Sequence, residues 1–204
     1  MATLRIRRSF LAQLLVYSML SCMFAKSHAA SDAPPGNAEL DDQNGSHDFD
    51  LAVGQWKADI SRRSHPLSGS GAWVSYTGKT LVTPVWNGRA QLVQLEADGP
   101  AGRLELLSLR LYNPEKREWS LYYGNSTDGS LTPPVTGRFR NGRGEFYGND
   151  QFNGRAIRVR QTISAPQKSL HLEQAFSADQ GRTWEVNFLE TLTRLPATEE
   201  AHDH

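Results

Sequence analysis

The sequence predicts an all-β protein in which a meander of about ten antiparallel strands closes into a barrel. The tripeptide Asn-Gly-Arg occurs at 87–89, 141–143 and 153–155, each time between two strand-like runs. Asn-Gly tolerates the positive φ angles that a two-residue hairpin turn needs. Helical periodicity is nearly absent, and closure of the meander removes the exposed edges of an open sheet.

The strands are expected as hairpins and as single extended runs. The Asn-Gly turns join strands at 79–86 and 89–97, at 135–140 and 143–148, and at 147–152 and 155–164. Further extended runs are expected at 55–62, 72–76, 104–112, 119–125, 170–177 and 184–194. In the last run, Trp184, Val186, Phe188 and Leu192 are predicted to share one face. One short helical turn is expected at 48–53, before the first strand.

The N-terminal residues have the pattern of a secretory signal peptide. Arg5, Arg7 and Arg8 precede an apolar run over 10–25 that ends near small residues. This run is shorter than the roughly 20 residues that span a bilayer. We therefore predict a signal peptide at 1–29 and a secreted or periplasmic protein, with no membrane span after cleavage.

The remaining boundaries follow from composition. Residues 30–46 lack apolar periodicity and are rich in Pro, Gly, Asn and Asp, so they are predicted to form a disordered acidic linker. The barrel domain is expected at 47–195 and a disordered tail at 196–204. The single cysteine, Cys22, lies within the predicted signal peptide. A lipoprotein anchored at Cys22 is the alternative, but the preceding residues 19–21 form a poor lipobox.

The composition narrows the classes of function. The 204 residues are 38% hydrophobic and 22% charged, with a net charge of zero at pH 7. Cleavage after residue 29 would leave no cysteine, and therefore neither a disulfide nor thiol chemistry. Many of the acidic residues lie at 31–50 and in the tail, so the body at 51–195 is mildly basic. We interpret this body as a solvated surface of mixed charge.

Residues 177–184, SADQGRTW, fit the pattern Ser-x-Asp-x-Gly-x-Thr-Trp and resemble the Asp box of sialidases. A sialidase-like enzyme also needs a propeller of four-stranded blades and a tyrosine nucleophile. A body of about 150 residues is too short for that propeller. We predict a structural hairpin turn instead, formed by Ser177, Asp179, Gly181, Thr183 and Trp184. In such a turn the carboxylate accepts backbone N–H groups, the glycine takes a positive φ and the tryptophan packs on the loop.

The segment Phe49-Asp50-Leu51-x-x-Gly54-x-Trp56 is similar to the opening of secreted bacterial families of unknown function with lipocalin-like barrels. Further matching segments lie at 109–114, 119–122, 173–177 and 184–185. The resemblance covers roughly 46–195 and departs at Ala52 and Val53. It implies a lipocalin-like (calycin) barrel and an exported protein, and it implies no established reaction.

Three polar residues, Gln161, Gln174 and Glu190, fall on the apolar faces of predicted strands. Buried polar groups need partners, which here are one another, water or a ligand. Together with Trp56 and Tyr123, these residues are predicted to line an interior with room for one small ligand. An internal network with water and no ligand explains the same pattern.

We therefore predict an exported barrel that binds a small, largely apolar ligand in its interior, and we assign no catalytic residue. One alternative is a hydrolase or isomerase that uses an inward carboxylate such as Glu190, with Glu173 or Glu185 as a second acid. The other is a structural or envelope protein whose barrel is packed. The sequence leaves the ligand and the oligomeric state open.

No cofactor, metal or nucleic-acid partner is expected. Nitrobindin-like barrels bind haem through a histidine, but His171 alternates away from the apolar face of its strand and is expected to point outward. No metal-ligand spacing is present. The arginines near two hairpins are interpreted as ordinary outward residues of an exported protein; they lie at 138, 140, 143, 155, 158 and 160.

Overall fold

The computed structural model describes residues 45–166 and 169–195. The predicted signal peptide at 1–29, which includes Cys22, lies outside the described residues, as does the predicted tail at 196–204. Of the predicted linker at 30–46, only the last two residues are described.

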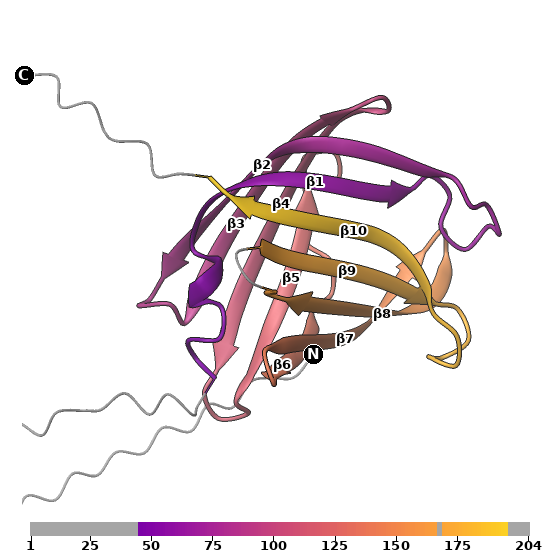
Figure 1. The fold of residues 1–204 in the computed structure, drawn as a ribbon. Coiled ribbons are helices and arrows are strands. Elements are labelled where there is room, and N and C mark those ends of the chain that lie inside the picture. The colour runs from indigo at the N-terminus through magenta and orange to yellow at the C-terminus, as the bar shows by residue number, and fades with distance from the viewer. Residues whose placement is uncertain (1–44, 167–168, 196–204) are drawn as a thin grey trace, which may run out of the picture. The chain divides into compact units, whose positions relative to one another are not determined.

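Ten antiparallel strands form one closed barrel, in which each strand pairs with the next and β10 pairs with β1 (Figure 1). The strands are β1 (Gly54–Arg63), β2 (Trp73–Val85), β3 (Ala90–Gly99), β4 (Gly102–Asn113), β5 (Glu118–Asn125), β6 (Val135–Arg140), β7 (Arg143–Phe152), β8 (Arg155–Ser164), β9 (Ser169–Ser177) and β10 (Glu185–Arg194). A short 3-10 helix, η1 (Asp50–Ala52), precedes β1. This confirms the predicted fold class, an antiparallel meander closed into a lipocalin-like barrel.

The Asn-Gly turns lie where the sequence predicts them. The φ angles are 51° and 75° at Asn141 and Gly142, and 51° and 74° at Asn153 and Gly154. Two positive φ angles in succession are what a type I′ hairpin turn requires. At the remaining turn, Trp86 also has a positive φ of 52°, so β2 ends at the residue before it.

The runs predicted at 72–76 and 79–86 are one continuous strand, β2. Gly78 lies in its middle, directly opposite Ala97 of β3. A Cβ atom at position 78 would lie 2.0 Å from the carbonyl oxygen of Glu96. The glycine therefore marks a close approach of two strand backbones, not a break between strands.

A bulge in β10 was not predicted. The register with β9 shifts between Val186 and Phe188, because Asn187 is an extra residue in the strand. Trp184 and Val186 therefore do not share the face of Phe188 and Leu192, and the prediction of a single row is wrong. The side chain of Asn187 is only 2% exposed.

One end of the barrel is closed by an aromatic cluster around Phe49, which precedes η1 and is 1% exposed. Its ring centroid lies 4.9 Å from that of Trp119, 5.0 Å from that of Phe139 and 5.9 Å from that of Phe146. These rings come from β5, β6 and β7. A residue outside the strands therefore connects three of them.

Helix η1 is held against the barrel by side chains of the first and last strands. Trp56 Nε1 donates to the carbonyl oxygen of Ala52 at 2.8 Å. Arg194 donates to the carbonyl oxygens of Val53 and Leu51 at 3.0 and 2.8 Å, and its guanidinium lies 4.1 Å from the centre of the Trp56 ring. The helix thereby becomes a fixed cap at this end.

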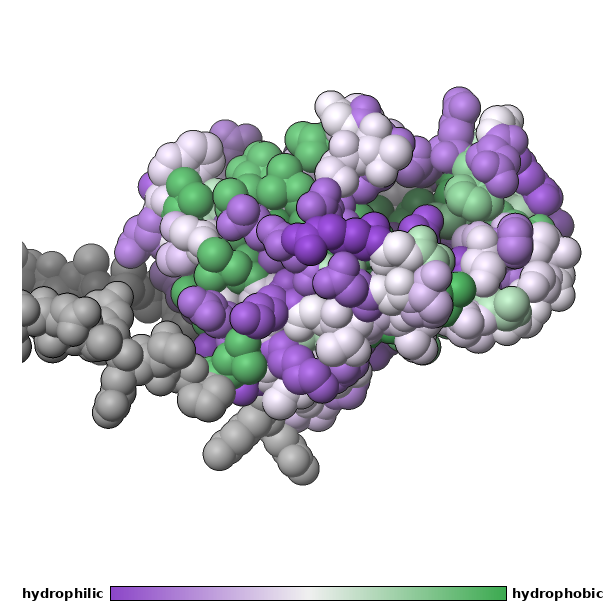
Figure 2. Space-filling view, turned by 90° about the horizontal axis from the view of Figure 1, so that it is seen from above, coloured by the Kyte–Doolittle hydropathy of each residue, from purple (hydrophilic) through white to green (hydrophobic). Residues whose placement is uncertain are grey.

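The outer surface is mixed in polarity. Figure 2 shows polar groups interspersed with separate apolar ones over the face that it views. This is the pattern of antiparallel strands that keep one face in the core and the other in solvent.

We expect Phe49→Ala to lower the free energy of unfolding by about 3–5 kcal/mol, because it removes a buried ring and leaves a void at the closed end. Leu51→Ala is the matched control, since Leu51 lies in the same cap and is 46% exposed; it should cost less than about 1 kcal/mol. Urea unfolding of the three proteins measures both values. Equal losses for the two variants would show that the cap is not part of the core.

Candidate functional site

The barrel interior contains a cavity of about 480 Å³. Much of its wall is apolar and comes from inward residues of four strands. These residues are Val93, Leu95, Leu104, Leu106, Leu172 and Phe188. The cavity reaches the surface at the end opposite η1, where Arg62 of β1, the start of β4 and the turn after β5 form its rim.

A chain of hydrogen bonds runs along one wall of the cavity. The Tyr123 hydroxyl donates to Gln161 Oε1. Gln161 Nε2 donates to Gln174 Oε1 at 3.1 Å, and Gln174 Nε2 donates to Asn187 Oδ1 at 3.0 Å. The chain crosses from β5 through β8 and β9 to β10. It ends at Asn187 Nδ2, which is buried and has no hydrogen-bond partner among the described residues.

Arg110 lies at the inner end of the cavity, beneath the aromatic cap, and is 7% exposed. Its Nη1 donates to Gln91 Oε1 at 3.1 Å, and Gln91 Nε2 donates to the carbonyl oxygen of Phe49 at 2.8 Å. The guanidinium carbon lies 4.4 Å from the centre of the Phe49 ring. Burial lowers the pKa of Arg110, but a guanidinium remains protonated at neutral pH.

Two donors on β4 lack hydrogen-bond partners among the described residues. They are Arg110 Nε and Ser108 Oγ, both buried. Positions 108 and 110 lie on the same face of the strand, and both residues line the cavity. Burial raises the pKa of Tyr123 to about 12, and the nearby Arg110 charge and Ser108 hydroxyl oppose that shift only in part; Ser108 and Tyr123 form no hydrogen bond of normal geometry.

Glu190 is the acidic residue in the inner part of the cavity and is 8% exposed. Its Oε1 accepts a hydrogen bond from the Thr80 hydroxyl at 3.2 Å. Burial raises the pKa of Glu190 to about 7, although the Thr80 hydrogen bond and the charge of Arg110 both oppose the shift. No ion pair within 4.0 Å joins Glu190 to Arg110 in the described part of the chain.

The structure places four of the five predicted interior residues on the cavity wall: Tyr123, Gln161, Gln174 and Glu190. Trp56 is 3% exposed, but it lies in the cap and does not line the cavity.

Sequence reasoning missed Ser108, Arg110 and Asn187. The segment 104–111 has leucines on both faces of the strand, so alternation gave no reason to point Arg110 inward. A charged residue within an apolar run was the only available signal. Asn187 is buried and bonded to Gln174 because of the bulge, which period-two reasoning does not detect.

The three carboxylates considered for acid–base chemistry do not come together. Glu190 lies inside the barrel. Glu173 faces outward and accepts a bond from Arg160 Nη2 at 3.2 Å. Glu185 accepts a hydrogen bond from the backbone N–H of Leu67 at 2.7 Å. This arrangement offers no pair of carboxylates for general acid–base catalysis.

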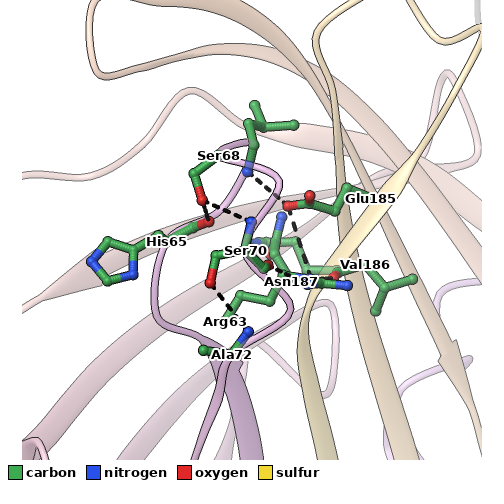
Figure 3. Close-up of polar contacts among 10 residues, drawn as sticks. Arg63, His65, Ser68, Ser70, Ala72, Glu185, Val186 and Asn187 are labelled. Carbon is green, nitrogen blue, oxygen red and sulfur yellow. Dashed lines mark hydrogen bonds and ion pairs between the residues drawn. The ribbon is translucent and has the colours of Figure 1, made fainter.

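Glu185 takes part in a clamp on the loop between β1 and β2 (Figure 3). Arg63 Nε donates to the carbonyl oxygen of Val186 at 2.7 Å, and its Nη1 donates to that of Ser70 at 2.8 Å. Arg63 and Glu185 lie 3.9 Å apart. These bonds fix the loop to the bulged start of β10.

The SADQGRTW segment forms the turn between β9 and β10. Asp179 accepts hydrogen bonds from the N–H groups of Arg182 and Thr183 at 3.0 and 2.9 Å, and from the Thr183 hydroxyl at 2.6 Å. These bonds hold the pKa of Asp179 well below its usual range. Ser177 Oγ accepts the N–H of Gly181 at 2.7 Å, and Gly181 has a φ of +93°.

Trp184 packs on the outside of the barrel. Its ring lies 6.1 Å from that of Tyr147 and 5.0 Å from the guanidinium of Arg160. Every residue of the pattern therefore has a contact that shapes or fastens the turn. The five residues of the turn are absent from the 480 Å³ cavity.

Other features narrow the chemistry. The described residues hold no group of three or more His, Cys, Asp or Glu side chains arranged to bind a metal ion. His171 is exposed and contacts Ser169 and Thr191. None of the helices in the described residues is long and apolar enough to cross a membrane.

No protein-family model matches the chain, and no curated protein matches it. Among solved structures, that of the S-type phycobiliprotein lyase CPES from Guillardia theta is similar at 12% sequence identity and a TM-score of 0.48. The match covers 74% of this chain and 92% of the lyase. A likeness at this level transfers no function, and the fold assignment rests on the strand pairing itself.

We expect the stability of the protein to fall as the pH rises from about 5 to 8. The folded state binds more protons than the unfolded state between the unfolded pKa of Glu190, 4.5, and its folded value of about 7, so the slope of the unfolding free energy with pH is negative. The loss amounts to at most about 3 kcal/mol. Urea unfolding at several pH values should show that Glu190→Gln removes this loss; an unchanged slope would contradict the assignment.

We expect Asp179→Ala to lower the Tm by several degrees and to leave ligand affinity within about twofold, because the carboxylate only closes the β9–β10 turn. Arg182→Ala is the control, since Arg182 is exposed in the same turn. Differential scanning calorimetry measures the Tm. If Asp179→Ala left the Tm unchanged but abolished ligand binding, the turn at residues 177–184 would have a role in binding and not only in structure.

Proposed function

We propose that the protein binds one small, largely apolar ligand inside the barrel. The observation that carries the proposal is the cavity of about 480 Å³ with its apolar wall. Its volume lies within the range of small-molecule sites. Among the described residues, two buried donors on this wall, Ser108 Oγ and Arg110 Nε, have no hydrogen-bond partner, and a bound molecule would supply one.

The cavity distinguishes this proposal from a packed structural barrel. Close-packed cores leave few voids larger than a water molecule, and an apolar void of this size lowers stability. The closed end shows that this chain does pack densely where Phe49 and Trp119 meet, at 1% and 0% exposure. The open space in the other half of the barrel is therefore a feature that ligand binding explains.

An enzymatic role has less support from the same residues. Glu190 is one acid with a pKa near neutrality, which suits a general acid or base. However, the polar groups that interact with Glu190 are those of Thr80, Arg110 and Tyr123. None of these three is a carboxylate or a histidine that could act as a second acid or base. We therefore retain binding as the function.

Export is part of the proposal and rests on the sequence. The basic start, the apolar run at 10–25 and the small residues up to Ala29 are typical of a signal peptide. A binding barrel in the periplasm or outside the cell would meet small apolar molecules there.

The test uses the neutral fluorescent probe N-phenyl-1-naphthylamine, which brightens in apolar surroundings. We expect saturable one-to-one binding. Leu106→Trp should weaken it at least tenfold, because the indole fills the space beside Leu95, the residue opposite it on β3. Leu189→Trp is the control, since Leu189 is 40% exposed and does not line the cavity, and it should change affinity less than twofold.

Fluorescence titration and native mass spectrometry give independent answers. A retained small molecule in the mass spectrum and a selective loss in Leu106→Trp support the proposal. Equal affinities for the two tryptophan variants, or no saturable binding by the wild type, would contradict it.

A further inference from the structure

We propose that the ligand is an apolar molecule with a carboxylate head group, and that this head group binds Arg110 at the inner end of the cavity. The inference rests on the proposed function and names its ligand class. It follows from a buried cation that the described residues leave incompletely satisfied.

The first step is the cost of burying Arg110. A charge removed from water needs both hydrogen bonds and an opposite charge to be stable. In the described part of the chain, Arg110 has one hydrogen bond to a neutral amide, that of Gln91, and the face of the Phe49 ring. Its Nε has no partner. The protein therefore holds a cation in place without a bonded counter-ion.

Two donors lie together at the inner end of the cavity. Ser108 and Arg110 both line the cavity and both are more than nine-tenths buried. Each has one donor without a hydrogen-bond partner among residues 45–166 and 169–195. An anion at this end would accept hydrogen bonds from a guanidinium and a hydroxyl on adjacent inward positions of β4. A guanidinium presents several N–H donors in one plane, which matches the two oxygens of a carboxylate.

The rest of the cavity wall suits an apolar tail. Beyond Arg110 the cavity is lined by Leu95, Leu106 and Phe188 on the way to the rim. A head group at Arg110 would therefore place an apolar tail against apolar side chains. A phosphate or a nucleotide would leave its remaining charges without partners in this wall, which favours a monocarboxylate.

The ionisation of Glu190 should make the affinity for a carboxylate ligand depend on pH. Thr80 on β2, Arg110 on β4 and Tyr123 on β5 face it, and the residues paired with it on β1 and β9 are the apolar Ile60 and Leu172. The charged rim residues Arg62, Arg103, Glu105 and Asp128 lie at the other end of the cavity. An ionised Glu190 would repel the head group and compete for Arg110, so affinity should fall as Glu190 loses its proton.

The experiment compares dodecanoate with dodecanol by isothermal titration calorimetry at pH 6.5. The two share one tail and differ in the charge of the head. We expect dodecanoate to bind the wild type about 10- to 100-fold more tightly, as a charge-assisted hydrogen-bonded pair implies. Arg110→Gln should abolish this preference, so that its affinities for dodecanoate and dodecanol differ by less than about threefold.

Arg62→Gln is the matched control, because Arg62 is an arginine at the rim of the same cavity; it should change the preference less than threefold. In the wild type the affinity for dodecanoate should fall about tenfold between pH 6.5 and 8.5, and Glu190→Gln should remove that fall. If Arg110 had only a structural role, the Arg110→Gln variant would keep the wild-type preference for dodecanoate over dodecanol and the wild-type pH dependence of that preference.

Each outcome decides between the proposals. Equal affinities of the wild type for dodecanoate and dodecanol would overturn the carboxylate proposal alone, while the proposed function would stand. A preference lost in Arg62→Gln and kept in Arg110→Gln would also overturn it, because the ligand would then bind head outward. Failure of all three probes to bind the wild type would refute the proposed function itself. If Arg110→Gln does not fold, the wild-type comparison and Glu190→Gln still decide.

Discussion

The position of Phe49 across one end of the barrel is the constraint on which the rest of the structure depends. Its ring contacts aromatic residues of three strands, and its carbonyl oxygen accepts a hydrogen bond from Gln91. The same ring supports the guanidinium of Arg110 at 4.4 Å. The cap therefore both closes the hydrophobic core and holds a cation at the inner end of the cavity.

The interior of the barrel has a densely packed half near the cap and an open half toward the rim. Near the cap, Trp119, Leu121 and Phe146 are each 0% exposed and fill the space. Toward the rim, the inward side chains leave a cavity of about 480 Å³. Tyr123, Gln161 and Gln174 on its wall are hydrogen-bonded in a chain that continues to Asn187. Among the described residues, Arg110 has a hydrogen bond to Gln91 but no bonded counter-ion, which makes it the point where a ligand would gain most.

Sequence reasoning predicted the features that local chemistry determines. The turns could be predicted because Asn-Gly tolerates the positive φ angles that they need. The inward orientation of Gln161 and Gln174 could be predicted from the alternation of apolar residues in β8 and β9. Arg110 was not, because its strand carries leucines on both faces and only the strand pairing shows which face is inside. Asn187 was missed for another reason: a bulge changes the alternation of β10, and no residue type signals it. Trp56 is buried, but it belongs to the cap and not to the cavity wall, so its predicted place in the wall is wrong.

A crystal structure of the protein with dodecanoate tests the central claim most directly. The account predicts one molecule inside the barrel, with its carboxylate oxygens within hydrogen-bond distance of the Arg110 guanidinium and its tail against Leu106 and Phe188. A carboxylate at Arg62 on the rim, or a molecule bound only to the outer surface of the barrel, would contradict it.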